Sequence, residues 1–210
     1  MEIAEAFKED IPVRFLNALN RHVTQAYESG KQAVDDQGLG PDEAYNVLPL
    51  TRRGHVETAL RRAAAECGLS IVTENTGYWR HVVVTCGRFR ITQTTTLDTD
   101  SPLRKAAYKC GYANEQQLLL DLDFGDMEPT PAHEDPHLYA IIIHRGPVLA
   151  SEPDFMKIKF PKPDLAGYHE GEVDLAIYAE LPEAEHATSE EQIADEAIPK
   201  LKPKRARSAG

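Results

Sequence analysis

The chain of 210 residues lacks the features that mark disulfide-stabilised, exported or membrane-spanning proteins. Its only cysteines are Cys67, Cys86 and Cys110, and no C-x-x-C pair occurs, which argues against a disulfide framework and against a zinc knuckle. No apolar run reaches the length of about 18 residues that a membrane helix needs, and Met1 to Asp10 is charged where a signal sequence would be apolar. The sequence therefore predicts a cytoplasmic protein without membrane contact.

Motifs that would name an enzyme are also missing. The segment His133-Glu134-Asp135-Pro136-His137 has the letters H-E-x-x-H, but Pro136 disfavours the helical turn that brings both histidines of a zinc protease onto one metal. Solvated histidines in an acidic loop are the favoured interpretation, and a loop metal site made by His133 and His137 is the alternative. The acidic loop 121 to 137 does not match a calcium-binding loop, because its glycine is misplaced. The sequence predicts no catalytic residues, no bound metal and no cofactor.

One layout resembles an enzyme core without its ligands. A helix that carries Glu57 and precedes a β-hairpin is the arrangement of many metal-dependent nuclease cores, which hold Mg²⁺ with clustered carboxylates and a lysine. The hairpin contains no acid, since it reads Arg90-Ile91-Thr92-Gln93 where a carboxylate-x-Lys sequence would be expected. Helix ion pairs from Glu57 to Arg61 and from Arg62 to Glu66 explain these acids. An inactive or divergent nuclease-like fold stays an alternative by analogy.

Charge is distributed unevenly along the chain. Residues 52 to 109 carry ten Lys/Arg and five Asp/Glu, although the whole chain carries 23 and 34. The flanking segments, 1 to 51 and 110 to 180, are both acidic. A basic patch within an acidic protein attracts polyanions or an acidic protein surface, and the net charge of −11 favours solubility. This separation of charge predicts a partner of opposite sign.

The C-terminal segment differs in composition from the rest. Residues 181 to 199 hold six acids and no base, and five bases without an acid follow in 200 to 210. So few large apolar residues cannot offset the entropy of ordering, which predicts a disordered tail over 181 to 210. Residues 1 to 180 are then expected to form one domain with its own hydrophobic core.

Helical periodicity is clear in two segments before residue 70. The first helix is predicted from Pro12, carries apolar side chains from Phe15 to Tyr27, and is expected to end at Gly30. The second is predicted to be capped by Thr51 and to end at Gly68. Its outer face would present His55, Thr58, Arg61 and Arg62.

Three extended segments follow the second helix, and the last two form a predicted hairpin. Residues 81 to 85 and 88 to 96 are rich in β-branched side chains, and Cys86 with Gly87 would be the turn. One face of this hairpin then gathers polar side chains, and the other is apolar. The polar face is the candidate binding surface, with Trp79 beside it: His81, Arg88, Arg90, Thr92 and Thr94.

The remaining elements complete the fold class. A helix opened by Ser101-Pro102, a stop at Gly111 and a second helix from Asn114 resemble a helix-turn-helix, but ordinary packing of two short helices is the favoured interpretation. Strands are predicted over 138 to 144, 155 to 160 and 173 to 179. The chain is therefore expected to be an α+β domain with a mixed or antiparallel sheet flanked by several helices.

Two functions compete for the basic segment. Aromatic side chains next to bases can stack on nucleobases while the cations contact phosphates, which favours a nucleic-acid-binding regulatory or defence-type protein. In the alternative, the chain is a protein interaction module that binds an oppositely charged protein through an edge strand, with an acidic surface that serves solubility or mimics nucleic acid towards a basic partner. Its basic and acidic halves can also neutralise each other. The residues predicted to bind nucleic acid are His55, Arg61, Arg62, Trp79, His81, Arg88, Arg90 and Thr92.

Overall fold

A computed structural model describes residues 3–76, 79–122 and 137–179 of the chain. The predicted tail, 181 to 210, lies outside the described residues, as do His133 and nearly all of the acidic loop 121 to 137. Within the described part, none of the helices combines the length and the apolarity needed to cross a bilayer.

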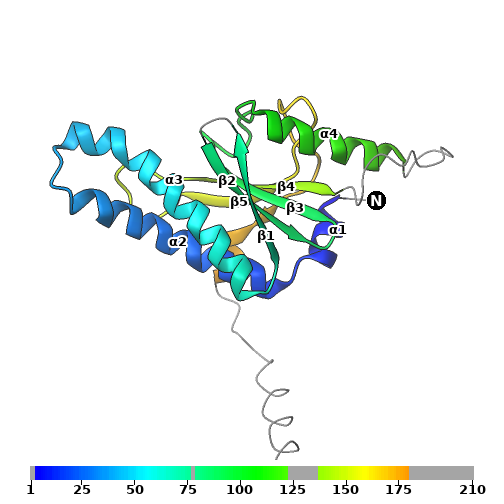
Figure 1. The fold of residues 1–210 in the computed structure, drawn as a ribbon, viewed down its shortest axis with the longest axis horizontal. Coiled ribbons are helices and arrows are strands. Elements are labelled where there is room, and N and C mark those ends of the chain that lie inside the picture. The colour runs from blue at the N-terminus through cyan, green and yellow to red at the C-terminus, as the bar shows by residue number, and fades with distance from the viewer. Residues whose placement is uncertain (1–2, 77–78, 123–136, 180–210) are drawn as a thin grey trace, which may run out of the picture. The chain divides into compact units, whose positions relative to one another are not determined.

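The described residues form four α-helices, six strands and one 3₁₀ helix (Figure 1). In chain order they are α1 (Ile3–Asp10), α2 (Val13–Asp35), α3 (Pro41–Glu66), β1 (Ser70–Thr76), β2 (Trp79–Cys86), β3 (Phe89–Thr95), α4 (Ala107–Leu122), β4 (Leu138–Arg145), β5 (Phe155–Lys159), β6 (Val173–Asp174) and η1 (Leu175–Ala179).

The six strands make one mixed sheet whose order in space follows their order in the chain, from β1 to β6. β3 and β4 are parallel, and every other neighbouring pair is antiparallel. A parallel pair needs a crossover connection, and here the crossover between β3 and β4 contains α4. The predicted α+β class with a mixed sheet and flanking helices is confirmed.

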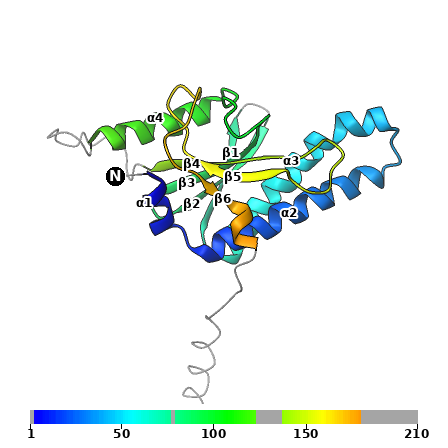
Figure 2. The same cartoon turned by 180° about the vertical axis from the view of Figure 1, so that it is seen from behind.

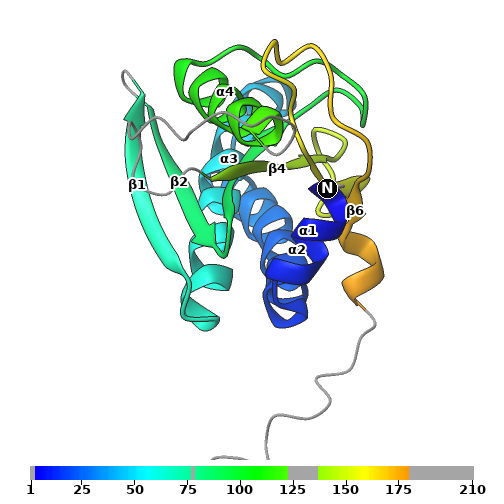
Figure 3. The same cartoon turned by 90° about the vertical axis from the view of Figure 1, so that its right-hand side faces the viewer.

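The helices cover both faces of the sheet. α2 and α3 pack on one face, and α4 packs on the other (Figure 3). The 3₁₀ helix η1 returns beside α2 (Figure 2), where the side-chain amide of Asn20 donates a hydrogen bond to the carbonyl of Leu175.

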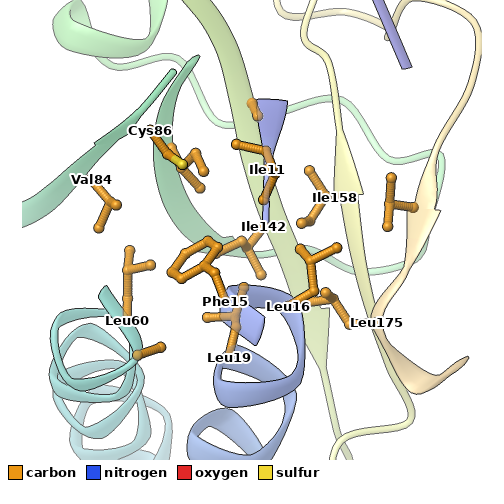
Figure 4. Close-up of a cluster of buried hydrophobic side chains, with 14 of the residues drawn as sticks. Ile11, Phe15, Leu16, Leu19, Leu60, Val84, Cys86, Ile142, Ile158 and Leu175 are labelled. Carbon is orange, nitrogen blue, oxygen red and sulfur yellow. The ribbon is translucent and has the colours of Figure 1, made fainter. Parts of the chain in front are cut away.

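The large cluster is the set of thirty buried apolar side chains between the α1–α3 helices and the sheet. Figure 4 shows its centre, where Phe15, Leu16 and Leu19 of α2 point toward Ile142 and Ile158 of the sheet. The small cluster lies on the α4 face and consists of eight buried residues: Val83, Leu103, Tyr112, Ala113, Tyr139, Ile141, Ile143 and Leu165. Alternate residues of β4 enter different clusters, because successive side chains of a strand point to opposite faces.

The first two long helices differ from their predicted bounds. α2 continues through Gly30 to Asp35, so the predicted stop at Gly30 is wrong. A Cβ atom at Gly30 would lie 3.3 Å from the Cα of Arg52, so glycine allows α2 and α3 to approach closely. α3 begins at Pro41 rather than at Thr51, which lies in its interior. The predicted end is confirmed, since Gly68 follows the helix with a positive φ of 67°.

The hairpin forms, with a different turn from the predicted one. Cys86 pairs with Phe89, so Gly87 and Arg88 make the turn, and Arg90 lies opposite Thr85 rather than Val83. A shift of two positions preserves the alternation of faces, so Val84 and Ile91 still share the apolar face.

Two further predictions are corrected after the hairpin. α4 is one helix that runs through Gly111 and Asn114, so the predicted break into two helices at Gly111 is wrong, and the resemblance to a helix-turn-helix does not hold. Residues 101 to 106 are not helical, because Leu103 is buried in the small cluster and its backbone N–H donates to the carbonyl of Leu165. The last predicted strand shortens to β6, and η1 replaces its second half.

Candidate nucleic-acid interface

Apart from Arg88, which is exposed at the turn, the predicted polar face of the hairpin is covered by α4. His81 and Thr92 are buried, and the hydroxyl of Thr92 lies 2.8 Å from that of Tyr139. The ring of His81 stacks on Tyr108 of α4, with the ring centroids 3.8 Å apart. Trp79 belongs to β2, and its side chain lies outside the described part of the structure.

Arg88 and Arg90 are neutralised by acids from the same chain. The guanidinium of Arg88 donates to both carboxylate oxygens of Asp10 at 2.8 and 2.9 Å, and this contact lowers the pKa of Asp10. Nη1 of Arg90 lies 2.8 Å from Oε2 of Glu115, and its guanidinium carbon lies 5.2 Å from the ring centre of Tyr112. These two arginines therefore contribute to the basic segment of the sequence, but their charges are neutralised by acids of the same chain.

Arg61 and Arg62 lie on different sides of α3, as expected for adjacent residues of a helix. Nη2 of Arg61 donates to the Thr73 hydroxyl of β1 at 2.8 Å. Arg62 and His55 instead line a groove of about 160 Å³ against α2, together with His22. The predicted ion pair from Arg62 to Glu66 is replaced, because Glu66 binds Arg21 at 2.7 Å.

Glu57 occupies the gap between β2 and β3, defined here as the space where the two strands separate beyond the Val84–Ile91 pair. Its Oε2 accepts the backbone N–H of Val82 at 2.8 Å, and its Oε1 accepts Nε2 of Gln93 at 2.7 Å. Burial raises the pKa of Glu57, and these two hydrogen bonds oppose the rise. The carboxylate thus accepts the backbone hydrogen bond that a neighbouring strand would otherwise accept. Its hydrogen-bond partners are Val82 and Gln93 rather than the predicted Arg61, which binds Thr73.

A buried hydrogen-bonded chain supports Glu57 from behind. Oε1 of Gln93 lies 2.9 Å from Nε2 of His144, and Nδ1 of His144 lies 2.7 Å from the hydroxyl of Tyr27. Burial and the charge of Arg52 lower the pKa of His144 to about 3, so its ring is neutral. Since an amide oxygen only accepts, Nε2 carries the proton, and Tyr27 donates to Nδ1. Each donor therefore points toward Glu57, which favours its negative charge.

The α4 side of the gap is cationic. The ammonium of Lys109 is buried and donates to the hydroxyl of Thr94 at 3.0 Å. Burial, together with the positive charges of Arg53 and Arg104, lowers the pKa of Lys109 to about 8. Burial also lowers the pKa of His81, although Oε2 of Glu74 lies 3.7 Å from its Nε2. Arg53 of α3 and Arg104 of the connector before α4 thus both act on the charge of Lys109.

Sequence reasoning missed Lys109 as a member of this site, and it considered Glu57 as the acid of a nuclease-like layout before assigning it to a helix ion pair. The available signal for Glu57 was its place next to Val56 and three residues before Leu60, on the border of an apolar stripe. For Lys109 no signal existed in the sequence, because α4 was expected to break at Gly111 and its packing side was unknown.

The gap does not fit the Mg²⁺ site of a nuclease-like core. Both oxygens of Glu57 already accept N–H groups, and the oxygen of Gln93 faces His144. Within residues 3–76, 79–122 and 137–179, no group of three or more His, Cys, Asp or Glu side chains is placed to hold a metal ion. Lys109 and Arg53 add positive charge where a cation would bind. We therefore derive no catalytic step through a metal at this gap.

Comparison with protein-family models, curated proteins and solved structures gave no match to this chain. The functional conclusion consequently depends on the arrangement of its own residues.

Proposed function

We propose that the protein binds nucleic acid and holds the phosphate backbone at the mouth of the gap between β2 and β3. The observation that carries this proposal is the buried ammonium of Lys109 on α4, which donates to the hydroxyl of Thr94 and is subject to the positive charges of Arg53 on α3 and Arg104 in the connector before α4. Phosphates and cationic side chains supply most of the affinity between proteins and nucleic acids.

The state of Lys109 explains why an anion fits there. A buried ammonium is costly unless it is paired, and the partner that the structure shows is a neutral hydroxyl. The positive charges of Arg53 and Arg104 disfavour the ammonium further, although the carboxylate of Glu57 partly opposes this effect. A phosphate oxygen beside Lys109 would offset both effects, whereas Glu57 and Glu74 would keep the phosphate on the cationic side of the gap.

The layout of the fold supports the same class of ligand. The helix with Glu57 precedes a hairpin, as in the metal-dependent nuclease cores that this arrangement resembles, and those cores act on phosphodiesters. Because the donor set does not fit Mg²⁺, the proposal is binding without hydrolysis. The two arginines already paired on the hairpin, Arg88 and Arg90, are left out of this interface.

The test is fluorescence anisotropy with a labelled single-stranded oligonucleotide and a duplex of the same sequence. Three phosphate contacts predict that affinity falls about 40-fold between about 50 and 200 mM salt. Lys109→Met removes the charge and nearly conserves volume, so affinity should fall about tenfold, and Lys162→Met, an exposed lysine after β5, should change it less than about twofold.

The pH dependence sharpens this test. Lys109 is protonated at pH 7 and becomes neutral as the pH rises through about 8, so affinity should decrease between pH 7 and 9. Lys109→Arg keeps the charge and should remove most of this decrease. Absence of polyanion binding at low salt, or equal affinities for the Lys109→Met and Lys162→Met variants, would contradict the proposal.

A further inference from the structure

β1 forms an exposed edge of the sheet (Figures 1 and 3). In the described part of the chain it pairs with β2 alone, and the opposite edge is the two-residue strand β6. Natural edge strands are usually short or carry lysine, proline or a bulge that prevents pairing with another chain. β1 is seven residues long, contains neither lysine nor proline, and pairs with β2 in unbroken register.

The direction of the free backbone groups follows from the contact of Glu57. The N–H of Val82 donates to Glu57 in the gap, so it points away from β1. Val82 lies opposite Thr73, and this pair therefore exchanges no ladder hydrogen bonds. In an antiparallel pair, bonded and non-bonded positions alternate. Ile71, Thr73 and Asn75 consequently direct their N–H and C=O groups outward, where another strand can pair.

The side chains beside this edge differ between the two faces of the sheet. Arg61 reaches β1 through the Thr73 hydroxyl, and the exposed Arg80 lies opposite Asn75 on the same face. On the other face, Val72 is 51% exposed next to Val83 of the small cluster. An added strand would thus meet positive charge on one face and, on the other, the apolar Val72 next to Glu74, whose carboxylate lies 3.7 Å from Nε2 of His81.

We propose that β1 binds an extended peptide segment of a partner protein in which acidic and apolar side chains alternate. Backbone pairing with Ile71, Thr73 and Asn75 would supply affinity, and Arg61, Arg80 and Val72 would select the sequence. A second copy of this chain fits less well, because a β1–β1 pair centred on Thr73 would place two Arg61 side chains together. This surface is separate from the three cations of the proposed nucleic-acid interface.

The first experiment titrates the full chain with an acetylated, fluorescent peptide of alternating valine and glutamate. The proposal expects saturable binding that weakens at least tenfold in the double variant Arg61→Glu, Arg80→Glu. A peptide of alternating valine and lysine should show the reverse preference and bind the double variant more tightly than the original protein. Arg62→Glu is the matched control, since Arg62 is exposed on the same helix but faces the groove against α2.

The second experiment locates the peptide without any substitution. Hydrogen–deuterium exchange should slow at the amides of β1 when the valine–glutamate peptide is added, because these N–H groups gain carbonyl partners. Sedimentation of the protein alone should show a monomer that does not pair through β1.

Three outcomes overturn the inference. In the first, the acidic peptide does not bind, or it binds the double variant and the Arg62→Glu control equally. In the second, binding leaves the exchange of the β1 amides unchanged. In the third, the protein alone forms a dimer that Thr73→Pro abolishes in a folded variant, which assigns the edge to a second copy.

Discussion

The two faces of the sheet are built differently. The face under α2 and α3 carries the large cluster and a hydrogen-bonded chain from Tyr27 through His144 and Gln93 to Glu57, although the buried Nε of Arg52 has no hydrogen-bond partner among the described residues. The face under α4 carries the small cluster, together with a buried lysine and a histidine, His81, whose two ring nitrogens find no hydrogen-bond partner among the described residues.

This difference indicates a division of labour. Buried polar groups that are fully bonded stabilise one structure, whereas groups left partly satisfied reduce stability and are typical of binding sites. In the proposed function, the α2–α3 face stabilises the fold, and the α4 face supplies the cationic and aromatic groups that contact the ligand. Substitutions on the two faces should separate stability from binding.

The largest expected effect is the loss of an aromatic ring from the large cluster. Phe15→Ala should lower the free energy of unfolding by about 3–5 kcal/mol, because Phe15 is fully buried and the cavity cannot close completely. Leu103→Ala in the small cluster should cost about 2 kcal/mol. Urea unfolding measures both, and equal losses would contradict the proposed division.

The free energy of unfolding should decrease at acid pH because of His144, which is buried neutral behind Glu57. The native ring stays neutral down to a pKa of about 3, whereas the unfolded chain takes up a proton below about pH 6.5. The unfolded state then binds more protons, so stability is lost as the pH falls from about 6.5 toward 3, by roughly 3 kcal/mol at pH 4.5. His144→Gln should flatten this slope in urea unfolding at pH 7 and 4.5, and an unchanged slope would place the acid sensitivity elsewhere.

Arg52 lies beside Tyr27, at the end of the hydrogen-bonded chain that is farthest from Glu57. Its guanidinium donates to the carbonyls of Pro147, Val148 and Ala150 and lies 4.3 Å from the ring centre of Tyr27. Arg52→Met should cost about 2 kcal/mol, since these carbonyls lose their donor. Arg62, which is exposed on the same helix, supplies the control, because Arg62→Met should change the melting temperature little. Equal shifts for both variants would show that the three carbonyls do not depend on Arg52.

Removing the charge of Lys109 should raise stability, whereas removing that of Arg52 should lower it. The native ammonium loses its proton near pH 8, and the unfolded lysine does so near pH 10.4, so stability should rise by about 2 kcal/mol between pH 8 and 10. Lys109→Met should be more stable than the original protein at pH 7 and should lack this rise, which thermal unfolding at several pH values can measure. A destabilised Lys109→Met protein would show that the lysine serves packing.

The smallest effect is expected at the pair of Arg88 and Asp10. Arg88 is exposed, so Arg88→Gln should cost only about 0.5–1 kcal/mol, and salt should reduce this difference. Oligonucleotide affinity should change less than for Lys109→Met. If affinity falls equally in the two variants, the interface extends onto the hairpin turn.

Much of the fold could be predicted because its signals are local. The run from Leu138 to His144 is apolar and β-branched, and it forms β4, buried on both faces. Phe15 to Tyr27 repeat at helical spacing and form the buried side of α2. The faces of the hairpin were also correct despite the misplaced turn, because a shift of two positions leaves the alternation unchanged.

The errors have a common physical origin in packing between distant segments. Gly30 does not end α2, because the close approach of Arg52 favours a residue without a side chain there. Gly111 does not end α4, because the next two residues of the helix, Tyr112 and Ala113, are buried in the small cluster. In each case tertiary contacts override a local propensity that is worth about 1 kcal/mol.

The sequence by itself determined the fold class, the strands and the excess of basic residues between 52 and 109, since composition and periodicity belong to the chain alone. Only the tertiary structure decided which acids pair with Arg88 and Arg90, and which charges act on Lys109 at the gap. The physical reason is distance: electrostatic energy depends on the separation of charges in space, and residues such as Arg53 and Lys109 become neighbours only when α3 and α4 pack on opposite faces of a sheet whose strands have parted.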